Sequence, residues 1–230
     1  MSSICIITAR GGSKRIPKKN IKEFCGKPII AYSIETALAS KLFDEVMVST
    51  DSEEIAAVAR HYGAKVPFMR SEKASDDFAS TEDVLEEVLK EYAKRNIQYE
   101  WFACLYPTAP LISNERLLQA YDLMKADDID AVEPVVIFSY PPQRCYVKKS
   151  GLIEYKWSEY KDSRSQDLEP YYHDAGQFYF FKTAPFLKMR RNNQELKKMA
   201  LVLDELEVQD IDNLSDWKLA ELKYKVINDA

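Results

Sequence analysis

"SICIITARGGSKRIPKKN" (residues 3–20) joins a continuous apolar run to a basic loop. The apolar run is rich in isoleucine, which is typical of a strand covered on both faces in a parallel sheet. In the loop, Gly11 and Gly12 lack a Cβ atom, so the backbone can turn sharply and present its N–H groups to an anion. The loop also carries five cationic side chains: Arg10, Lys14, Arg15, Lys18 and Lys19. We therefore predict a phosphate-binding loop after a buried strand, with a solvated basic turn as the alternative.

The composition limits the kinds of protein that this chain can be. Its 230 residues suit one domain, and a hydrophobic content of 46% is enough for a sizeable core. Because the net charge is -5, we expect no broad nucleic-acid surface, and any anion site must be local. Four widely spaced cysteines without a CxxC pair argue against disulfides and zinc. With neither a signal peptide nor a membrane-length apolar run, we expect a cytoplasmic protein that contacts no membrane.

Strand-like and helical patterns alternate along the first 136 residues. The sequence predicts strands at 3–9, 45–50, 101–107 and 130–136, and helices at 28–40, 52–64, 81–95 and 114–126. Such alternation implies right-handed crossovers and a mostly parallel α/β sheet. Ligands bind beyond the carboxyl ends of the strands in such sheets, which is where the basic loop and "PTAP" (107–110) fall.

The pattern changes from residue 138 to residue 175, which are rich in tyrosine, proline and charge. We interpret this segment as an excursion over one edge of the sheet that contributes to an active site or a partner interface. A return strand is predicted at 177–181 and one or two further strands within 199–212. A closing helix is predicted at 214–227, capped by Ser215 or Asn213.

Two common phosphate-binding patterns are absent from the basic loop. The P-loop pattern GxxxxGK[ST] is missing, which argues against a P-loop kinase or ATPase. The dinucleotide fingerprint GxGxxG is missing as well, which argues against a nicotinamide or flavin enzyme. Pro17 and the long run before Pro28 instead predict an extended flap that can wrap a triphosphate.

Three motifs resemble those of the CMP-sialic acid synthetase family: "ARGGSKRIPKKNI" (9–21), "STDSEEIAAVARHYGA" (49–64) and "YPTAP" (106–110). The resemblance runs from residue 4 to about residue 217. It implies a single Rossmann-like nucleotidyltransferase domain over residues 1–230 that uses CTP and Mg²⁺ and releases pyrophosphate. It also implies a homodimer, formed through the excursion at 138–175.

The resemblance assigns roles to individual residues by position. Arg10, Lys14 and Lys19 would be the catalytic cations at the CTP phosphates. The implied nucleotide-binding set is Ala9, Arg10, Gly11, Gly12, Ser13, Asn20, Ser80, Pro107, Thr108 and Ala109. Ser80 could equally be only a helix cap. Thr108 could be only a turn residue, but its place at the carboxyl end of a strand favours a functional role. Asp51 is expected simply to cap the helix that follows it.

"QDID" (209–212) supplies a pair of carboxylates, Asp210 and Asp212. In an extended segment both side chains would lie on one face, where they would repel each other and the phosphates unless a hard cation lay between them. The alternative is a pair of surface acids before a helix. The resembled family has a DxD pair here, which implies a magnesium site. The implied reaction is in-line attack of a sugar's anomeric hydroxyl on the α-phosphorus of CTP.

An acidic nine-carbon sugar needs a cation for its carboxylate. Arg144 and Arg164 are candidates because a guanidinium can form two parallel bonds, although surface ion pairing is the alternative for each. The implied sugar-binding set is Tyr106, Gln143, Arg144, Arg164, Gln166 and Tyr179.

The motifs "CLYPTAP" (104–110), "YPPQR" (140–144) and "RSQDLEPYYHDAGQFY" (164–179) look most like those of the pseudaminic acid cytidylyltransferases. Their product would serve bacterial surface-glycan or flagellin glycosylation. The alternatives are an N-acetylneuraminate or legionaminate synthetase, a sugar-1-phosphate enzyme, and a non-catalytic nucleotide-binding module.

Overall fold

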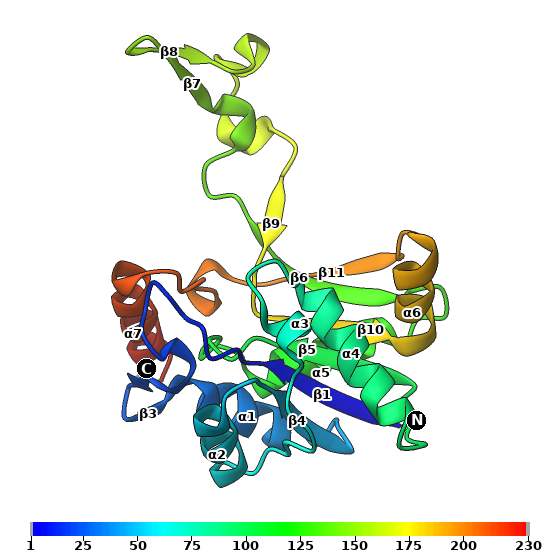
Figure 1. Ribbon diagram of the computed structural model, residues 1–230. Helices are drawn as coiled ribbons and strands as arrows, with labels where there is room; N and C mark the ends of the chain where they lie inside the picture. Colours follow the sequence, from blue (N-terminus) through cyan, green and yellow to red (C-terminus); the bar gives the residue numbers. More distant parts are fainter. Residues whose placement is uncertain (1, 229–230) are drawn as a thin grey trace.

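A seven-stranded sheet forms the centre of the protein, in a computed structural model that describes residues 2–228 (Figure 1). The strand order is β11-β6-β10-β5-β1-β4, with β9 paired to β6. β1 runs parallel to β4 and β5, and β11 runs parallel to β6, whereas β10 is antiparallel to both of its neighbours. The strands are β1 (Ser3–Thr8), β4 (Glu45–Ser49), β5 (Trp101–Leu105), β6 (Ala131–Ile137), β9 (Tyr172–Asp174), β10 (Phe178–Lys182) and β11 (Lys198–Val202). The predicted mostly parallel α/β sheet is confirmed.

Helices cover both faces of this sheet. They are α1 (Ile29–Ser40), α2 (Glu53–His61), α3 (Glu72–Ser75), α4 (Thr81–Ala93), α5 (Asn114–Met124), α6 (Thr183–Asn192) and α7 (Leu214–Asn228). Alternate side chains of β1 face opposite layers: Cys5 and Ile7 belong to the core that includes residues of α1, α2 and α5, and Ile4 and Ile6 to the core with α4 and α6. The isoleucine-rich run is therefore buried on both sides, as predicted.

The predicted strands and helices are all present, and the structure adds two helices that the sequence pattern did not predict. Ser80 caps α4 in a reciprocal capping box with Asp83. At α7 the cap is Asn213, whose Oδ1 accepts hydrogen bonds from the N–H groups of Ser215 and Asp216. The segment 199–212 contains one strand, β11, and residues 208–211 have no regular secondary structure. The short α3 and the ten-residue α6 were not predicted.

A third apolar cluster holds the basic loop against the C-terminal part of the chain. Ile16 of the loop is 1% exposed and packs with Phe24, Tyr32, Ile211 and Trp217. Phe24 belongs to a small hairpin of β2 (Glu23–Phe24) and β3 (Lys27–Pro28). Because Ile211 lies between the two predicted metal ligands, this cluster fixes the basic loop and the carboxylate pair against each other.

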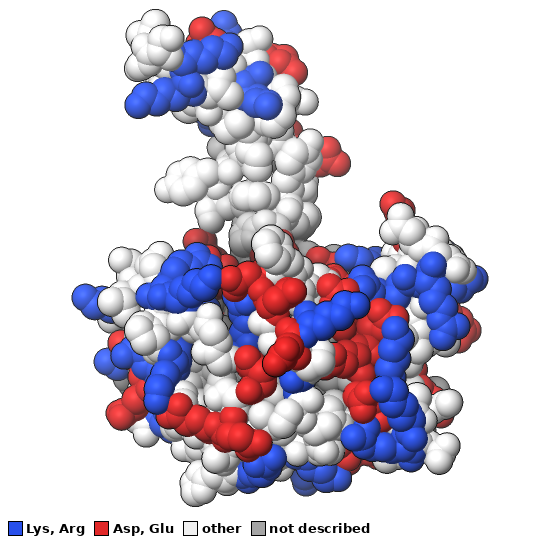
Figure 2. Space-filling view, viewed as in Figure 1, with Lys and Arg blue, Asp and Glu red and all other residues white. Residues whose placement is uncertain are grey.

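The excursion projects away from the body as an arm, defined here as residues 138–171, with the hairpin of β7 (Tyr146–Lys149) and β8 (Leu152–Tyr155) at its far end (Figure 1). It extends outward, rather than lying over the sheet edge, because the pairing of β6 with β9 continues past Val135, where the pairing with β11 ends. Lys and Arg cluster at the far end of the arm, while its middle section shows few charged groups (Figure 2). Within residues 2–228, no helix combines the length and apolar character that a membrane crossing needs.

Candidate functional site

A cavity of about 510 Å³ lies beyond the carboxyl ends of β1 and β5. It brings together four segments that are far apart in the sequence: the basic loop, residues 70–84, the end of β5, and Asp212 of the carboxylate pair. Its lining includes Thr8, Arg10, Ser13, Lys14, Arg15, Lys19, Asn20, Arg70, Asp76, Asp77, Ser80, Thr81, Tyr106, Pro107, Thr108 and Asp212. Most residues that the sequence assigned to phosphate and nucleotide binding therefore line one cavity.

The basic loop has a fixed shape built from local contacts. The N–H of Gly11 donates to Oδ1 of Asp51 at 2.7 Å, and Nδ2 of Asn20 donates to the carbonyl of Arg10 at 2.8 Å. A Cβ at Gly11 would lie 3.2 Å from Cβ of Ser52, so this close approach favours glycine, whereas a Cβ at Gly12 would meet open space. The prediction for Asp51 is wrong, because Ser52 caps α2 and Asp51 instead holds the loop.

Two cations of the loop converge on a carboxylate of the chain. Nη1 of Arg10 donates to Oδ1 of Asp77 at 2.9 Å, and Lys14 forms an ion pair with Oδ2 of the same group. Lys14, followed by Arg10, holds the pKa of Asp77 below its usual range. The Asp77 carboxylate shows that an anion fits between these two side chains. Asp77 lies in a polar loop without a recognisable motif, and the sequence analysis missed it.

The carboxylate pair faces the same loop. Nζ of Lys19 donates to the carbonyl of Ile211 at 2.7 Å, and Arg15 pairs with Asp212 at 2.7 Å. Burial lowers the pKa of Lys19, while Asp212 and Asp210 both act to raise it, so both carboxylates lie near this ammonium. Ile211 is buried, and Asp210 and Asp212 on either side of it are less buried. This alternation agrees with the prediction that the two carboxylates share one face of the segment.

The donor chemistry of this pair fits a hard cation. Burial, and after it the charge of Asp212, raises the pKa of Asp210 above its ordinary value. Carboxylate and phosphate oxygens are the ligands that Mg²⁺ prefers. No group of three or more His, Cys, Asp or Glu side chains suited to a metal occurs among residues 2–228, so triphosphate oxygens would have to complete the set. Asp212 lines the cavity and Asp210 adjoins it in sequence.

The part of the cavity lined by Arg70 and Ser80 contains a residue that the sequence analysis missed. Arg70 is 8% exposed, and its guanidinium donates to Oγ of Ser49 at 3.0 Å and to the Ser49 carbonyl at 2.6 Å. Burial lowers the pKa of Arg70 to about 10. Ser80 both caps α4 and lines the cavity, so its two interpretations are compatible. Ala9 and Ala109 are buried behind the lining.

A second cavity, of about 800 Å³, adjoins the first at Tyr106 and Thr81, which line both. The Tyr106 hydroxyl lies 3.2 Å from Oγ1 of Thr81, and the Tyr106 ring centroid is 5.6 Å from that of Tyr179. The Tyr179 hydroxyl donates to Oδ2 of Asp174 at 2.7 Å. Burial raises the pKa of both tyrosines, which keeps their hydroxyls protonated as donors. Tyr106 thus stands between the two cavities.

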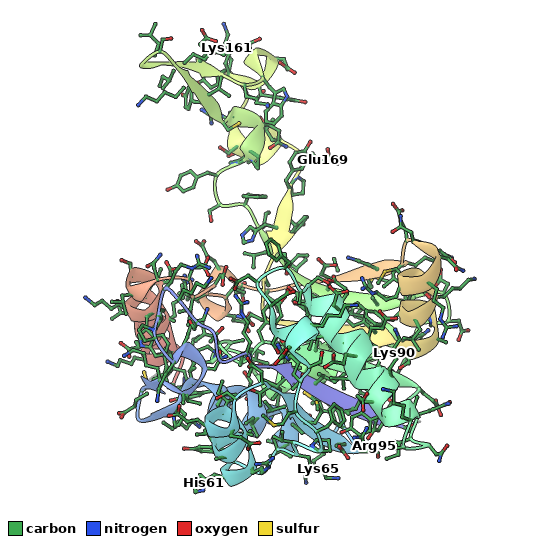
Figure 3. The ribbon with its side chains drawn as sticks, viewed as in Figure 1. His61, Lys65, Lys90, Arg95, Lys161 and Glu169 are labelled. Atoms are coloured by element: carbon green, nitrogen blue, oxygen red, sulfur yellow. The ribbon has the colours of Figure 1, made fainter. Side chains whose placement is uncertain are left out.

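The other four sugar-binding candidates lie on the arm and do not reach this cavity within their own chain. Gln143 donates to the carbonyl of Glu169 at 2.7 Å, and Glu169 is seen on the arm in Figure 3. Nη1 of Arg144 donates to Oγ of Ser165 at 3.3 Å, and Nε of Arg164 to Oδ2 of Asp167 at 2.8 Å. Gln166 lies in the same turn, η4 (Ser165–Asp167). Within this chain Arg164 forms a surface ion pair with Asp167, which agrees with the alternative interpretation of this arginine.

Histidine does not contribute to either cavity among the described residues. His61 lies at the exposed end of α2, on the side of the body away from the arm (Figure 3). The cavity therefore offers cations and carboxylates for phosphate chemistry, with no imidazole as a proton acceptor.

Comparisons with known proteins agree with this geometry. Residues 4–222 match the cytidylyltransferase family. The chain is 43% identical to a pseudaminic acid cytidylyltransferase of Campylobacter jejuni, covering 100% of this chain and 99% of that protein. It is 32% identical to a CMP-N,N'-diacetyllegionaminic acid synthase of Legionella pneumophila, with 100% and 99% covered. A CMP-2-keto-3-deoxy-manno-octonic acid synthetase solved with CTP has the same fold, with a TM-score of 0.73 at 17% identity over 100% of both chains. The chain belongs to the cytidylyltransferase family.

Proposed function

We propose that this chain transfers CMP from CTP to the anomeric hydroxyl of pseudaminic acid in the cytoplasm, giving CMP-pseudaminic acid and pyrophosphate for bacterial surface-glycan or flagellin glycosylation. The observation that carries the proposal is the single cavity in which the basic loop meets Asp212 and Tyr106. The choice of sugar is supported by 43% identity to the Campylobacter jejuni relative, against 32% to the legionaminic acid synthase.

Positioning and charge neutralisation would supply most of the catalysis. The sugar hydroxyl oxygen forms a bond to the α-phosphorus, and the bond from that phosphorus to the oxygen that bridges the α- and β-phosphates breaks. Pyrophosphate leaves with that oxygen, and the proton of the hydroxyl passes to solvent. Arg10 and Lys14 pair with Asp77 in this structure and would donate hydrogen bonds to the triphosphate oxygens instead when CTP binds. Such preorganised charge is worth most where it meets the charge that develops in the transition state.

Asp210 and Asp212 would hold a magnesium ion against the triphosphate. Bound there, the ion would neutralise phosphate charge and lower the pKa of a coordinated hydroxyl. A cation bound at the pair would offset the burial and the charge of Asp212 that together raise the pKa of Asp210. Lys19 and Arg15 supply part of that counter-charge and hold the segment to the basic loop.

The second cavity, at Tyr106 and Tyr179, would receive the sugar. Pseudaminic acid carries two acylamino groups and a terminal methyl, so an aromatic wall suits it better than an amide would. Asp174 lines this cavity and provides an acceptor for N–H groups. The sugar's anomeric end would point past Tyr106 toward the triphosphate.

Replacing Tyr106 with glutamine is expected to change sugar preference. The aromatic wall would be lost and an amide would face the sugar, so kcat/KM for pseudaminic acid should fall about tenfold relative to N-acetylneuraminic acid, the size expected for losing part of an apolar pocket wall. Steady-state kinetics with both acids measure this ratio, and Tyr121→Gln on α5 serves as a tyrosine control outside both cavities. An unchanged ratio would remove Tyr106 as a specificity residue.

The arm supports a further proposal, that two copies form a homodimer in which each arm contacts the other chain. Leu152 and Ile153 on the arm's hairpin are 73% and 64% exposed, and Tyr140 near its base is 90% exposed. Exposed apolar groups on a projecting hairpin are typical of interfaces. A dimer would also place Arg144 and Arg164 of one chain where they could reach the sugar of the other.

Sedimentation velocity tests the dimer directly. We expect a dimer for the natural chain and a monomer for Leu152→Asp with Ile153→Asp, because two charges would be buried at the interface without partners. Lys149→Gln is the matched control at the same hairpin, because it removes only an exposed ion pair with Glu154. A monomeric natural chain at micromolar concentration would contradict the proposal.

The test of the proposed function is pyrophosphate release from CTP and magnesium with pseudaminic, legionaminic and N-acetylneuraminic acids in parallel. Release with pseudaminic acid alone is expected. Release with a different acid would keep the chemistry and change the substrate. Silence with all three acids, from folded protein, would favour a sugar-1-phosphate enzyme or a binding module.

A further inference from the structure

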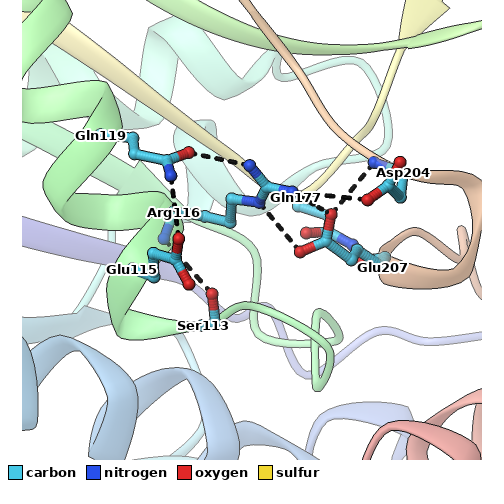
Figure 4. Close-up of polar contacts among 7 residues, drawn as sticks. All are labelled: Ser113, Glu115, Arg116, Gln119, Gln177, Asp204 and Glu207. Atoms are coloured by element: carbon cyan, nitrogen blue, oxygen red, sulfur yellow. Dashed lines mark hydrogen bonds and ion pairs between the residues drawn. The ribbon is translucent and has the colours of Figure 1, made fainter.

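The segment that carries the carboxylate pair is held by an arginine from a distant helix. Arg116 of α5 contacts Glu207 through two parallel bonds, Nε to Oε1 at 2.9 Å and Nη2 to Oε2 at 2.7 Å (Figure 4). Both side chains are largely shielded, with 22% and 24% exposed. The pair lowers the pKa of Glu207, first through its hydrogen bond to Arg116. Bidentate pairing of this kind fixes direction as well as distance.

Glu207 is also tied to the sugar side of the site. Its carbonyl accepts a hydrogen bond from Nε2 of Gln177 at 2.6 Å, and Gln177 is only 2% exposed (Figure 4). The carbonyl of Gln177 in turn accepts from the N–H of Tyr106 at 2.8 Å. One buried residue, two positions before Tyr179, therefore joins the end of β5 to the segment that leads to Asp210.

Two more contacts close the local turn, η5 (Glu205–Glu207). Oε2 of Glu207 accepts from the N–H of Asp204 at 3.0 Å. From α7, Nζ of Lys223 donates to the carbonyls of Glu205 and Val208 at 2.8 and 2.7 Å. Val208 and Gln209, the two residues between η5 and Asp210, have no regular secondary structure, so these side-chain bonds, rather than a sheet ladder, set their path.

We propose that Arg116, Glu207 and Gln177 form a positioning clamp, which sets the carboxylate pair at the right place relative to Tyr106 before the metal and CTP bind. None of the three lines the first cavity, so they act through the segment and not on the substrate. The need for a clamp follows from the path of this segment: residues 208–211 have no regular secondary structure, so no sheet ladder holds the two like-charged side chains in place. The clamp rests on the proposed function for the role of this pair.

The test uses Arg116→Gln, with Arg116→Lys as a conservative variant that keeps the charge but cannot form two parallel bonds. Arg95→Gln is the matched control, since Arg95 pairs with Glu91 at the far end of α4, away from the cavities (Figure 3). Hydrogen exchange of the amides at 203–213 is measured in metal-free protein. Binding of Mn²⁺, a spin probe for Mg²⁺, is measured with CTP present from the free-ion resonance signal.

Arg116→Gln is expected to speed exchange at 203–213 without changing β1 or β5. It should weaken Mn²⁺ binding about tenfold, the scale measured for residues that orient metal ligands. Turnover at saturating magnesium should stay within about twofold of the natural enzyme, because no group touching substrate is removed. For Arg116→Lys, exchange and Mn²⁺ binding should lie between those of Arg116→Gln and the natural chain. For Arg95→Gln, both should match the natural chain.

Two results would overturn the clamp alone: unchanged exchange at 203–213, or faster exchange with unchanged Mn²⁺ binding while the natural enzyme is active. The second result would mean that the contacts serve only stability. A natural chain that releases no pyrophosphate and binds no Mn²⁺ with CTP would overturn the proposed function and the clamp with it. The two failures are distinguishable, because failure of the proposed function is seen in the natural chain, whereas failure of the clamp is seen only in the Arg116 variants.

Discussion

The Asp210→Asn variant is expected to lose turnover by about 100-fold or more while it keeps its fold, because removing one charged group from a preorganised electrostatic site costs that much. Asparagine has nearly the shape of aspartate but offers a neutral oxygen, so the pair would keep only one negative ligand for the cation. The loss should be greatest at limiting magnesium. Pyrophosphate release measured against magnesium concentration gives both the half-saturating concentration and the turnover.

Stability separates this effect from unfolding. The pKa of Asp210 is raised in the folded protein, so the folded state binds the proton more tightly than the unfolded state. Its ionisation therefore opposes folding above that raised pKa, and the opposition disappears as the pH falls through it. Without metal, Asp210→Asn should be at least as stable as the natural chain at neutral pH. Thermal unfolding tests this expectation.

Asp122→Asn on α5 is the matched control, since Asp122 is exposed and pairs only with Lys125 in the described structure. It should leave turnover and magnesium dependence unchanged. Normal turnover of Asp210→Asn at limiting magnesium would remove the metal assignment. A large loss of stability in Asp210→Asn would instead show that the carboxylate has a structural role.

The basic loop after β1 could be predicted from sequence, because the residues that indicate it are close together in the chain. A buried run, a glycine pair and clustered cations all lie within residues 3–20, so their order along the chain already places a basic loop at a strand end. The start of α4 has a local signal too, because Ser80 and Asp83, three residues apart, form its capping box.

The remaining site residues depend on contacts between distant segments. Arg70 and Asp77 reach the cavity from irregular segments on either side of α3, and Arg116 contacts Glu207 across 91 residues of sequence. No local period marks such residues, because their role depends on which chain segments pack together. The helix α6 escaped prediction for a local reason. It has Pro185 in its first turn, where proline is tolerated, and only Phe186 is fully buried.

The direction of the arm could not be predicted from the sequence. The sequence predicted only an excursion here, and the structure shows that β7 and β8 form a hairpin within it. Where this hairpin points depends on how far β6 and β9 continue to pair, which the sequence pattern does not encode. The sugar-binding candidates on the arm are consequently separated from Tyr106 within one chain, although sequence resemblance placed them in one site.

Arg10→Ala is expected to lower kcat/KM for CTP by about 100- to 1000-fold, or roughly 3–4 kcal/mol of transition-state stabilisation. The guanidinium of Arg10 already donates to a carboxylate oxygen of Asp77 at 2.9 Å, so its position suits a phosphate oxygen. Because charge on the triphosphate grows toward the leaving pyrophosphate, the loss should fall on kcat as well as on KM.

Lys18→Ala is the matched control, because Lys18 belongs to the same loop but pairs with Glu54 at 2.7 Å and does not line the cavity. Asp77→Asn provides a second comparison: it removes the carboxylate that competes for Arg10 and Lys14, so KM for CTP should fall or stay the same. If Arg10 acted only by holding Asp77, the Asp77→Asn and Arg10→Ala variants would show the same loss. An unchanged kcat/KM in Arg10→Ala would remove it from the phosphate site, and the anion held between Arg10 and Lys14 would then be only the chain's own carboxylate.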